Sequence, residues 1–316
     1  MFANDLLRSL RLPVIAAPMF IVSGPELVIA QVKAGILGSF PALNARPASQ
    51  LDEWLARIAE ETAGSAVPFA VNLIVHKTNS RLHEDLALLE KWKVPLVITS
   101  LGANTEVNDA VHGWGGKVMH DVIDDRFARK AVEKGADGLI AVAAGAGGHA
   151  GVQSPFALVQ EIRAWFEGPL ALSGSIAHGR SILAAQAMGA DFAYVGTPWI
   201  ATDEANAIDA YKQAIVEGHA ADIVNSNLFT GVHGNYLRAS ITAAGLDPDN
   251  LPEGDKSAMD FGSGGSSAAK AWKDIWGAGQ GIGAIDAVQS VAARVDRLER
   301  QYLAAKQDLA RSAGFG

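Results

Sequence analysis

The sequence predicts a single (β/α)8 barrel, or TIM barrel, with an appended C-terminal segment. Between residues 13 and 218, short apolar runs alternate with longer stretches of helical period, and this alternation repeats as eight βα units. Eight parallel strands close a barrel, and closure removes the edge strands that an open sheet would expose. The length of 316 residues fits one large domain of this class.

The expected strands are short and apolar, and the expected helices end at glycine stop signals. The strands span Val14 to Met19, Ile36 to Pro41, Pro68 to Ile74, Leu96 to Leu101, Lys117 to Val122, Gly138 to Ala144, Pro169 to Gly174 and Phe192 to Gly196. Among the helices are Pro25 to Ala34, Asp124 to Lys134 and Arg180 to Met188. The rhythm changes after Gly218, so we divide the chain into a barrel (residues 1–218) and a loop and helical extension (residues 219–316) that packs on the barrel mouth.

Two features mark the extension. Residues 246–270 are rich in Asp, Pro, Gly and Ser and predict a lid-like loop. Ala284 to Ala313 has helical period, and we expect it to pack on the barrel or on a second subunit. Its apolar stripe consists of Val288, Val291, Ala292, Val295 and Leu298. We also expect Trp272 and Trp276 to be exposed. Together with the apolar stripe, they make a homodimer a candidate assembly.

Composition excludes several functions. The net charge of -8 argues against nucleic acid or anionic lipid as a partner, and the absence of cysteine excludes disulfides, iron–sulfur clusters and a Cys nucleophile. The eight histidines show no metal-ligand spacing, so we predict no metal. Without a signal-peptide pattern or a membrane-spanning apolar run, we expect a soluble cytoplasmic protein.

The loops after strands seven and eight predict a phosphate site. They carry Ser173, Gly174 and Ser175, and then Gly196 and Thr197. In a TIM barrel these two loops commonly hold phosphate, and glycine backbone with Ser and Thr hydroxyls supplies donors without any Lys. Two ordinary strand ends are the alternative interpretation, which their paired positions make less favourable.

Two other strand ends carry isolated polar side chains. His149 follows strand six among glycines, where it is a candidate proton acceptor near neutral pH, although it could merely bond a carbonyl. Asn72 lies in an apolar strand, where an amide needs a partner, so we expect it to face a polar ligand at the barrel mouth. His233 lies in a glycine-rich loop that could lean over the same site, but a surface role is the leading interpretation.

Together these segments resemble the nitronate monooxygenase family of FMN-dependent TIM barrels. The similarity runs in order from Pro13 to about Thr202 and resumes near the C-terminus. It rests on six motifs: Ala17-Pro18-Met19, Val71-Asn72-Leu73, Gly147-Gly148-His149-Ala150-Gly151, Ser173-Gly174-Ser175-Ile176, Gly196-Thr197 and Trp276-Gly277-Ala278-Gly279-Gln280. Each motif is weak alone, but six in the right order are specific to the superfamily.

The resemblance implies an FMN cofactor, a nitronate or related electron donor as small-molecule substrate, and O2 as acceptor. It implies that Pro18 and Met19, with the adjoining Phe20, lie against the flavin ring and that Asn72 bonds the polar edge of the ring. Gly148 would let His149, the catalytic candidate, reach the ring face. The implied phosphate contacts are Ser173, Gly174, Ser175, Gly196 and Thr197.

Three residues depart from the family pattern and leave the substrate open. Ala146 stands where relatives often have an acidic residue, Ser175 replaces a glycine, and Asp121 replaces a Lys or Ser and would place a negative charge near the flavin. An NAD(P)H:quinone reductase or an enoyl-thioester reductase would share the same FMN contacts. Outside this class, a flavin-free phosphosugar isomerase or aldolase and an inert flavin-binding protein stay open.

Overall fold

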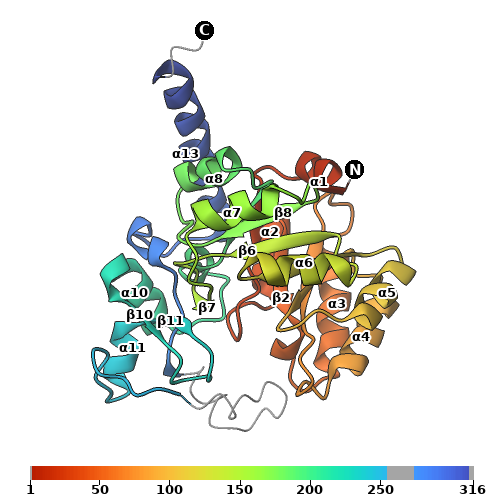
Figure 1. Ribbon diagram of the computed structural model, residues 1–316, viewed down its shortest axis with the longest axis horizontal. Coiled ribbons are helices and arrows are strands. Elements are labelled where there is room, and N and C mark those ends of the chain that lie inside the picture. The colour runs from red at the N-terminus through yellow and green to blue at the C-terminus, as the bar shows by residue number, and fades with distance from the viewer. Residues whose placement is uncertain (1, 255–273, 313–316) are drawn as a thin grey trace.

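Eight parallel strands form a closed barrel in the structure, a computed structural model that describes residues 2–254 and 274–312. The strand order is β1-β9-β8-β6-β5-β4-β3-β2, with helices outside (Figure 1). The first and last strands of this order meet through a parallel bridge between Ile15 and Leu37, and the amide of Ala16 donates to the Leu37 carbonyl at 2.8 Å. The predicted (β/α)8 fold is therefore confirmed.

Each barrel strand overlaps the segment predicted for it, and most are one to three residues shorter. The strands are β1 (Val14–Ala16), β2 (Gly38–Pro41), β3 (Phe69–Ile74), β4 (Leu96–Ser100), β5 (Lys117–Val122), β6 (Gly138–Val142), β8 (Leu170–Ser173) and β9 (Phe192–Val195). A second, antiparallel sheet consists of β7 (Gly148–His149), β10 (Ile223–Ser226) and β11 (Gly234–Leu237).

The helices lie between the strands and after the barrel. They are α1 (Phe2–Ser9), α2 (Pro25–Lys33), α3 (Gln50–Glu61), α4 (Leu82–Lys91), α5 (Thr105–Gly113), α6 (Asp125–Glu133), α7 (Pro155–Arg163), α8 (Gly179–Ala187), α9 (Thr197–Ile200), α10 (Asp209–Glu217), α11 (Arg238–Ala243) and α13 (Val291–Ser312). Three short 3-10 helices are η1 (Ala42–Asn44), η2 (Ala220–Asp222) and η4 (Gln280–Ala284).

Alternation along the strands separates an inner core from an outer one. Ile15, Ile98, Met119 and Phe192 point into the barrel, where Leu6 of α1 packs beneath them and fills its amino end. The alternate residues pack outward against the helices, because successive side chains of a strand point to opposite faces. The inner core is thus a filled layer, and only the carboxyl end of the barrel is left for a site.

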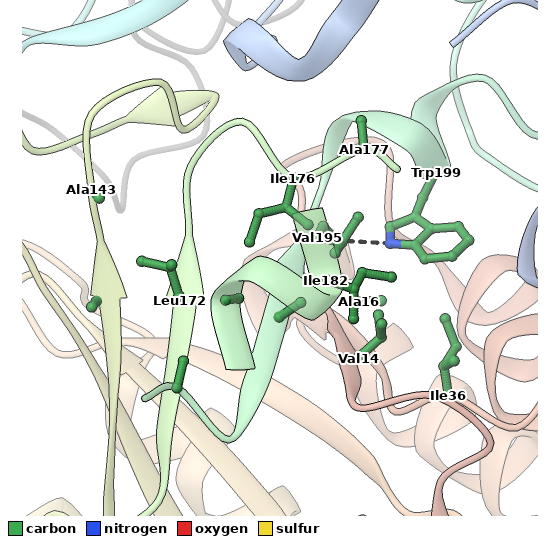
Figure 2. Close-up of a cluster of buried hydrophobic side chains, with 14 of the residues drawn as sticks. Val14, Ala16, Ile36, Ala143, Leu172, Ile176, Ala177, Ile182, Val195 and Trp199 are labelled. Carbon is green, nitrogen blue, oxygen red and sulfur yellow. Dashed lines mark hydrogen bonds between the residues drawn. The ribbon is translucent and has the colours of Figure 1, made fainter. Parts of the chain in front are cut away.

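The outer core supports the two loops predicted to bind phosphate. Trp199 of α9 is fully buried, and its indole Nε1 donates to the Val195 carbonyl at 2.8 Å (Figure 2). Ile176 and Ala177, which follow β8, belong to the same cluster as Ile182 of α8. The loops after β8 and β9 therefore rest on packed apolar side chains.

The final helix begins later than predicted. Sequence reasoning placed its start at Ala284, which instead ends η4, and α13 begins only at Val291. Ser290 Oγ accepts from the Ala293 amide at 3.2 Å, and the Glu204 carboxylate accepts from the Val291 amide at 2.9 Å. These two acceptors satisfy amides of the first helical turn, which fixes the start of the helix at this point.

Part of the predicted stripe on this helix is wrong. Val288 precedes the helix and is exposed, and Ala292 is exposed too, whereas Val291, Val295 and Leu298 are buried. The helix packs on α8 and α2, and its last turns extend past the body of the molecule (Figure 1). The close approach to α8 depends on Gly179, where a Cβ would collide with the Tyr302 backbone.

Other predictions for the extension are settled only in part. Trp276 is not exposed: it is partly buried and stacks on Tyr211 with ring centroids 5.1 Å apart. Trp272 and most of the predicted lid loop lie outside the described residues, and the boundary at residue 218 stays a prediction. Within residues 2–254 and 274–312, no helix has the length and apolar character needed to cross a membrane.

The packing of α13 yields a stability prediction. Leu298→Ala should lower the free energy of unfolding by about 2–5 kcal/mol, because it removes a buried side chain from the outer core. Leu309→Ala on the same helix is the matched control; its side chain is 53% exposed, so the change should stay within about 0.5 kcal/mol. Urea unfolding measures both values, and equal losses would contradict the packing described for α13.

Candidate active site

A cavity of about 910 Å³ opens at the carboxyl end of the barrel strands. Every residue that the sequence singled out for catalysis or cofactor binding contributes to its wall. These residues are Pro18, Met19, Phe20, Asn72, Gly148, His149, Ser173, Gly174, Ser175, Gly196 and Thr197. The structure thus brings together segments that are nearly 180 residues apart in the chain.

The floor of the cavity is polar. Besides Ser173 of the first phosphate loop, four strands carry a polar side chain two residues beyond a member of the inner apolar core. These side chains are Asn72 on β3, Ser100 on β4, Asp121 on β5 and Tyr194 on β9. Because inward positions recur every second residue, the strand register itself places these groups beside one another.

Three of these groups form a hydrogen-bonded chain. Asn72 Nδ2 donates to Ser100 Oγ at 2.7 Å and to the Ile98 carbonyl at 3.0 Å, and Ser100 Oγ donates to Asp121 Oδ2 at 2.7 Å. Neighbouring β4 therefore supplies the acceptors for the Asn72 amide hydrogens. Its Oδ1 remains the atom that it can present to a ligand, and that contact stays a prediction.

Asp121 is the floor's titratable group. Burial raises its pKa from 3.8 to about 6, although the Ser100 hydroxyl, which favours the carboxylate, opposes part of this shift. Burial also raises the pKa of Tyr194 well above its ordinary value, and the Asp121 charge adds to the effect. At neutral pH the floor therefore holds a carboxylate beside a neutral phenol.

The first phosphate loop has an unusual backbone. Ser175 adopts a left-handed φ of 56°, which L-residues other than glycine rarely do, and its amide donates to the Gly145 carbonyl at 3.3 Å. A Cβ on Gly145 would collide with Ser175 Oγ, so the loop after β6 touches the first phosphate loop. Strained backbone of this kind concentrates at ligand sites.

Thr197 connects the second loop to the C-terminal extension. Its Oγ1 accepts from the Gly279 amide at 2.9 Å, which leaves the hydroxyl hydrogen for another acceptor. The segments Ser173–Ala177 and Gly196–Thr197 contain no Lys or Arg. An anion here would be held by hydroxyls, backbone amides and the N-terminus of α8, and this donor set fits a phosphate.

His149 is held by the second sheet rather than by a free loop. It lies on β7, which pairs with β11, and its Nε2 lies 2.9 Å from Thr230 Oγ1. Thr230 Oγ1 also lies 3.0 Å from the Val232 carbonyl, to which it can donate. Burial lowers the pKa of His149 to about 4. The imidazole is therefore neutral at neutral pH.

Sequence reasoning missed Ser100, Tyr194 and Thr230. The period of two along the strands would have found Ser100 and Tyr194, but nothing local marks Thr230 as a partner of His149. His233, in the same loop, is exposed and its Nδ1 lies 2.9 Å from Asn225 Oδ1, so it bonds away from the cavity. Among the described residues, no three His, Asp or Glu side chains cluster as metal ligands would.

Comparisons with known proteins give a consistent result. A family model described as nitronate monooxygenase matches residues 81–299. The chain is 27% identical to a nitronate monooxygenase of Paraburkholderia phytofirmans, with 82% of each chain covered. It is 25% identical to a 5-hydroxy-7a-methyl-1-oxo-octahydro-1H-indene-4-carboxyl-CoA dehydrogenase of Rhodococcus jostii, over 73% of this chain and 68% of that one.

A solved structure shares the fold. Nitroalkane oxidase from Streptomyces ansochromogenes superposes with a TM-score of 0.82, and the match covers 96% of this chain and 99% of that chain at 24% identity. The barrel and the extension are therefore both part of a known architecture.

The raised pKa of Asp121 predicts how stability depends on pH. A carboxyl whose pKa is raised from 3.8 to about 6 stabilises the folded state below about pH 4, and this contribution is lost as the pH rises to about 6. Asp121→Asn stays neutral and can still accept from Ser100. Without flavin, its free energy of unfolding should match that of the native protein near pH 4 and exceed it by about 3 kcal/mol near pH 8, as measured by urea unfolding.

Asp137→Asn is the control of opposite sign. Lys117 and His112 contact Asp137 at 2.9 and 2.7 Å, and its pKa is lowered despite partial burial. Its replacement should therefore cost stability near pH 8 and near pH 4 alike, and the cost should shrink only as the pH falls below about 4. If the free energies of unfolding of Asp121→Asn and of the native protein instead differ by the same amount at every pH, the raised pKa of Asp121 is refuted.

Proposed function

The chain belongs to the nitronate monooxygenase family and is an oxidoreductase, and from this premise we propose that it uses FMN to oxidise alkyl nitronates with O2. The observation that carries the proposal is the convergence of all eleven predicted site residues on one cavity. Family membership also removes the support for a phosphosugar isomerase or aldolase. A cytoplasmic location and a homodimer stay predictions from the sequence.

The residues present fit FMN. The hydroxyls and amides of Ser173–Ser175 and Gly196–Thr197 would hold the phosphate, since they form a donor cradle on a rigid apolar support. Pro18 and Met19 would lie against the ring, and Asn72 Oδ1 would meet its polar edge. The bound flavin would take electrons from the nitronate and pass them to O2.

His149 would contact the substrate as a neutral group. Thr230 lies 2.9 Å from Nε2 and helps to orient the ring, and the neutral imidazole would accept a proton from a neutral nitroalkane. A nitronate is already deprotonated, and its negative charge beside the imidazole would raise the low pKa of His149. The same side chain would thus serve as a base towards one form of the substrate and as an electrostatic partner for the other.

Anaerobic stopped-flow absorbance tests the function directly. We expect propionate 3-nitronate to reduce the bound flavin rapidly and NADH not to do so. His149→Ala should slow the reduction roughly a hundredfold, because the electrostatic partner of the nitronate charge is lost. Reduction by NADH alone would assign the protein to the reductases of the superfamily. Bound flavin that neither donor reduces would favour an inert flavin-binding protein.

A comparison of FMN with riboflavin tests the phosphate loops. Ser173→Ala should weaken FMN binding roughly tenfold or more, because a hydrogen bond to a charged group is lost. Riboflavin lacks the phosphate, so its affinity for the same variant should stay unchanged, which makes it an internal control. Flavin fluorescence quenching measures both affinities. Equal losses for the two ligands would place the phosphate elsewhere.

A further inference from the structure

Part of the cavity mouth is apolar and exposed, in contrast to the floor. Ten large apolar residues are exposed in the described part of the chain, and four of them, exposed by 36% to 64%, line this one cavity. We call these four the apolar lip: Ile21, Ile123, Phe127 and Ile208. Exposed apolar side chains gathered around one cavity point to a binding surface.

We infer that the apolar lip binds the alkyl chain of the substrate, so that the protein selects medium-length alkyl nitronates over the shortest ones. This inference rests on the proposed function and goes on to name the substrate class. A polar floor below an apolar mouth fits a molecule with a polar reacting head and an apolar chain that points outward.

Ile21 provides independent support, because its backbone is strained. It lies in the loop after β1 with a left-handed φ of 65°, where a β-branched residue is a genuine outlier. Two asparagines hold it there: the Ile21 amide donates to Asn44 Oδ1 at 2.9 Å, and its carbonyl accepts from Asn206 Nδ2 at 3.0 Å. A glycine would adopt this backbone without strain. The isoleucine adds only an apolar side chain at the mouth.

The other lip residues lie on or next to helices, so the lip exists without any closing motion. Phe127 is in the first turn of α6, where its amide donates to the N-cap carboxylate of Asp124 at 2.8 Å. The Arg126 guanidinium stacks over its ring at 4.8 Å from the centroid. Ile208 is the N-cap residue of α10 and is the most exposed of the four.

A chain-length series tests the inference on the FMN-loaded protein. We would measure the second-order rate of anaerobic flavin reduction by primary alkyl nitronates from ethyl to octyl. The rate constant should rise roughly threefold for each methylene that reaches the lip, because each one leaves water for an apolar surface. Rates independent of chain length would overturn the inference.

Substitutions locate the effect. Ile208→Ser and Phe127→Ser should each flatten the dependence on chain length. Phe156→Ser is the matched control, since Phe156 is an exposed phenylalanine on α7 that does not line the cavity, and it should leave the dependence intact. An equal loss in all three variants would argue against a specific lip.

Ile21→Gly separates binding from folding. This variant relieves the left-handed strain, so it should unfold at no lower temperature than the native protein while it loses part of the chain-length dependence. A folded variant with an unchanged dependence would remove Ile21 from the lip.

Two further readouts distinguish the lip from its alternatives. Calorimetry measures how tightly unreactive straight-chain alkanols bind to the apolar lip, in the absence of any turnover. If alkanols bind more tightly with length but no nitronate reduces the flavin, the lip stands and the proposed function fails. Analytical sedimentation measures the oligomeric state of the protein. If Ile208→Ser dissociates an oligomer and leaves the chain-length dependence unchanged, the lip is an interface between copies and the inference fails.

Discussion

Successive side chains of each barrel strand alternate between the inside and the outside of the barrel, and this alternation determines which side chains reach the site. Most inward positions below the carboxyl end are filled by apolar residues such as Ile15, Met119 or Phe192, which makes the barrel a packed core. The buried hydroxyl of Ser39 on β2 bonds within the barrel wall, where it donates to the Ala16 carbonyl. Polar side chains face the cavity from inward positions near the carboxyl ends of the strands. Asn72, Ser100, Asp121 and Tyr194 occupy four of these positions, and their mutual distances follow from strand spacing.

This arrangement has an energetic consequence. Asp121 is enclosed by the barrel, and one hydroxyl bond does not offset the loss of water, so its pKa is raised. The site therefore holds a carboxylate that is easily protonated, and the same cavity holds a histidine whose pKa is lowered for the same reason. Burial has shifted both groups towards their neutral forms, and bound charges in the cavity would have a large effect on each.

The sequence predicted the barrel strands and eleven of the residues that line the cavity. These predictions depend on local signals: apolar period, glycine stops and motifs at strand ends. The errors arose where distant contacts decide. Ser290 and Glu204 set the start of α13, and Glu204 lies far away in the chain. Trp276 looked exposed because its cover, Tyr211, comes from α10. The partners of Asn72 come from the neighbouring strand, which only the barrel register brings close.

The placement of His149 shows why the extension belongs to the site. Gly148 and Gly151 lie close to the residue in sequence and leave the local backbone little constrained. β11 pairs with β7 and fixes the backbone, while Thr230 contacts the ring. Gly279 of the same extension bonds Thr197 in the phosphate loop. Residues after the barrel thus hold both ends of the site, so a barrel truncated near residue 218 would lose the orientation of its catalytic candidate even if its strands still closed.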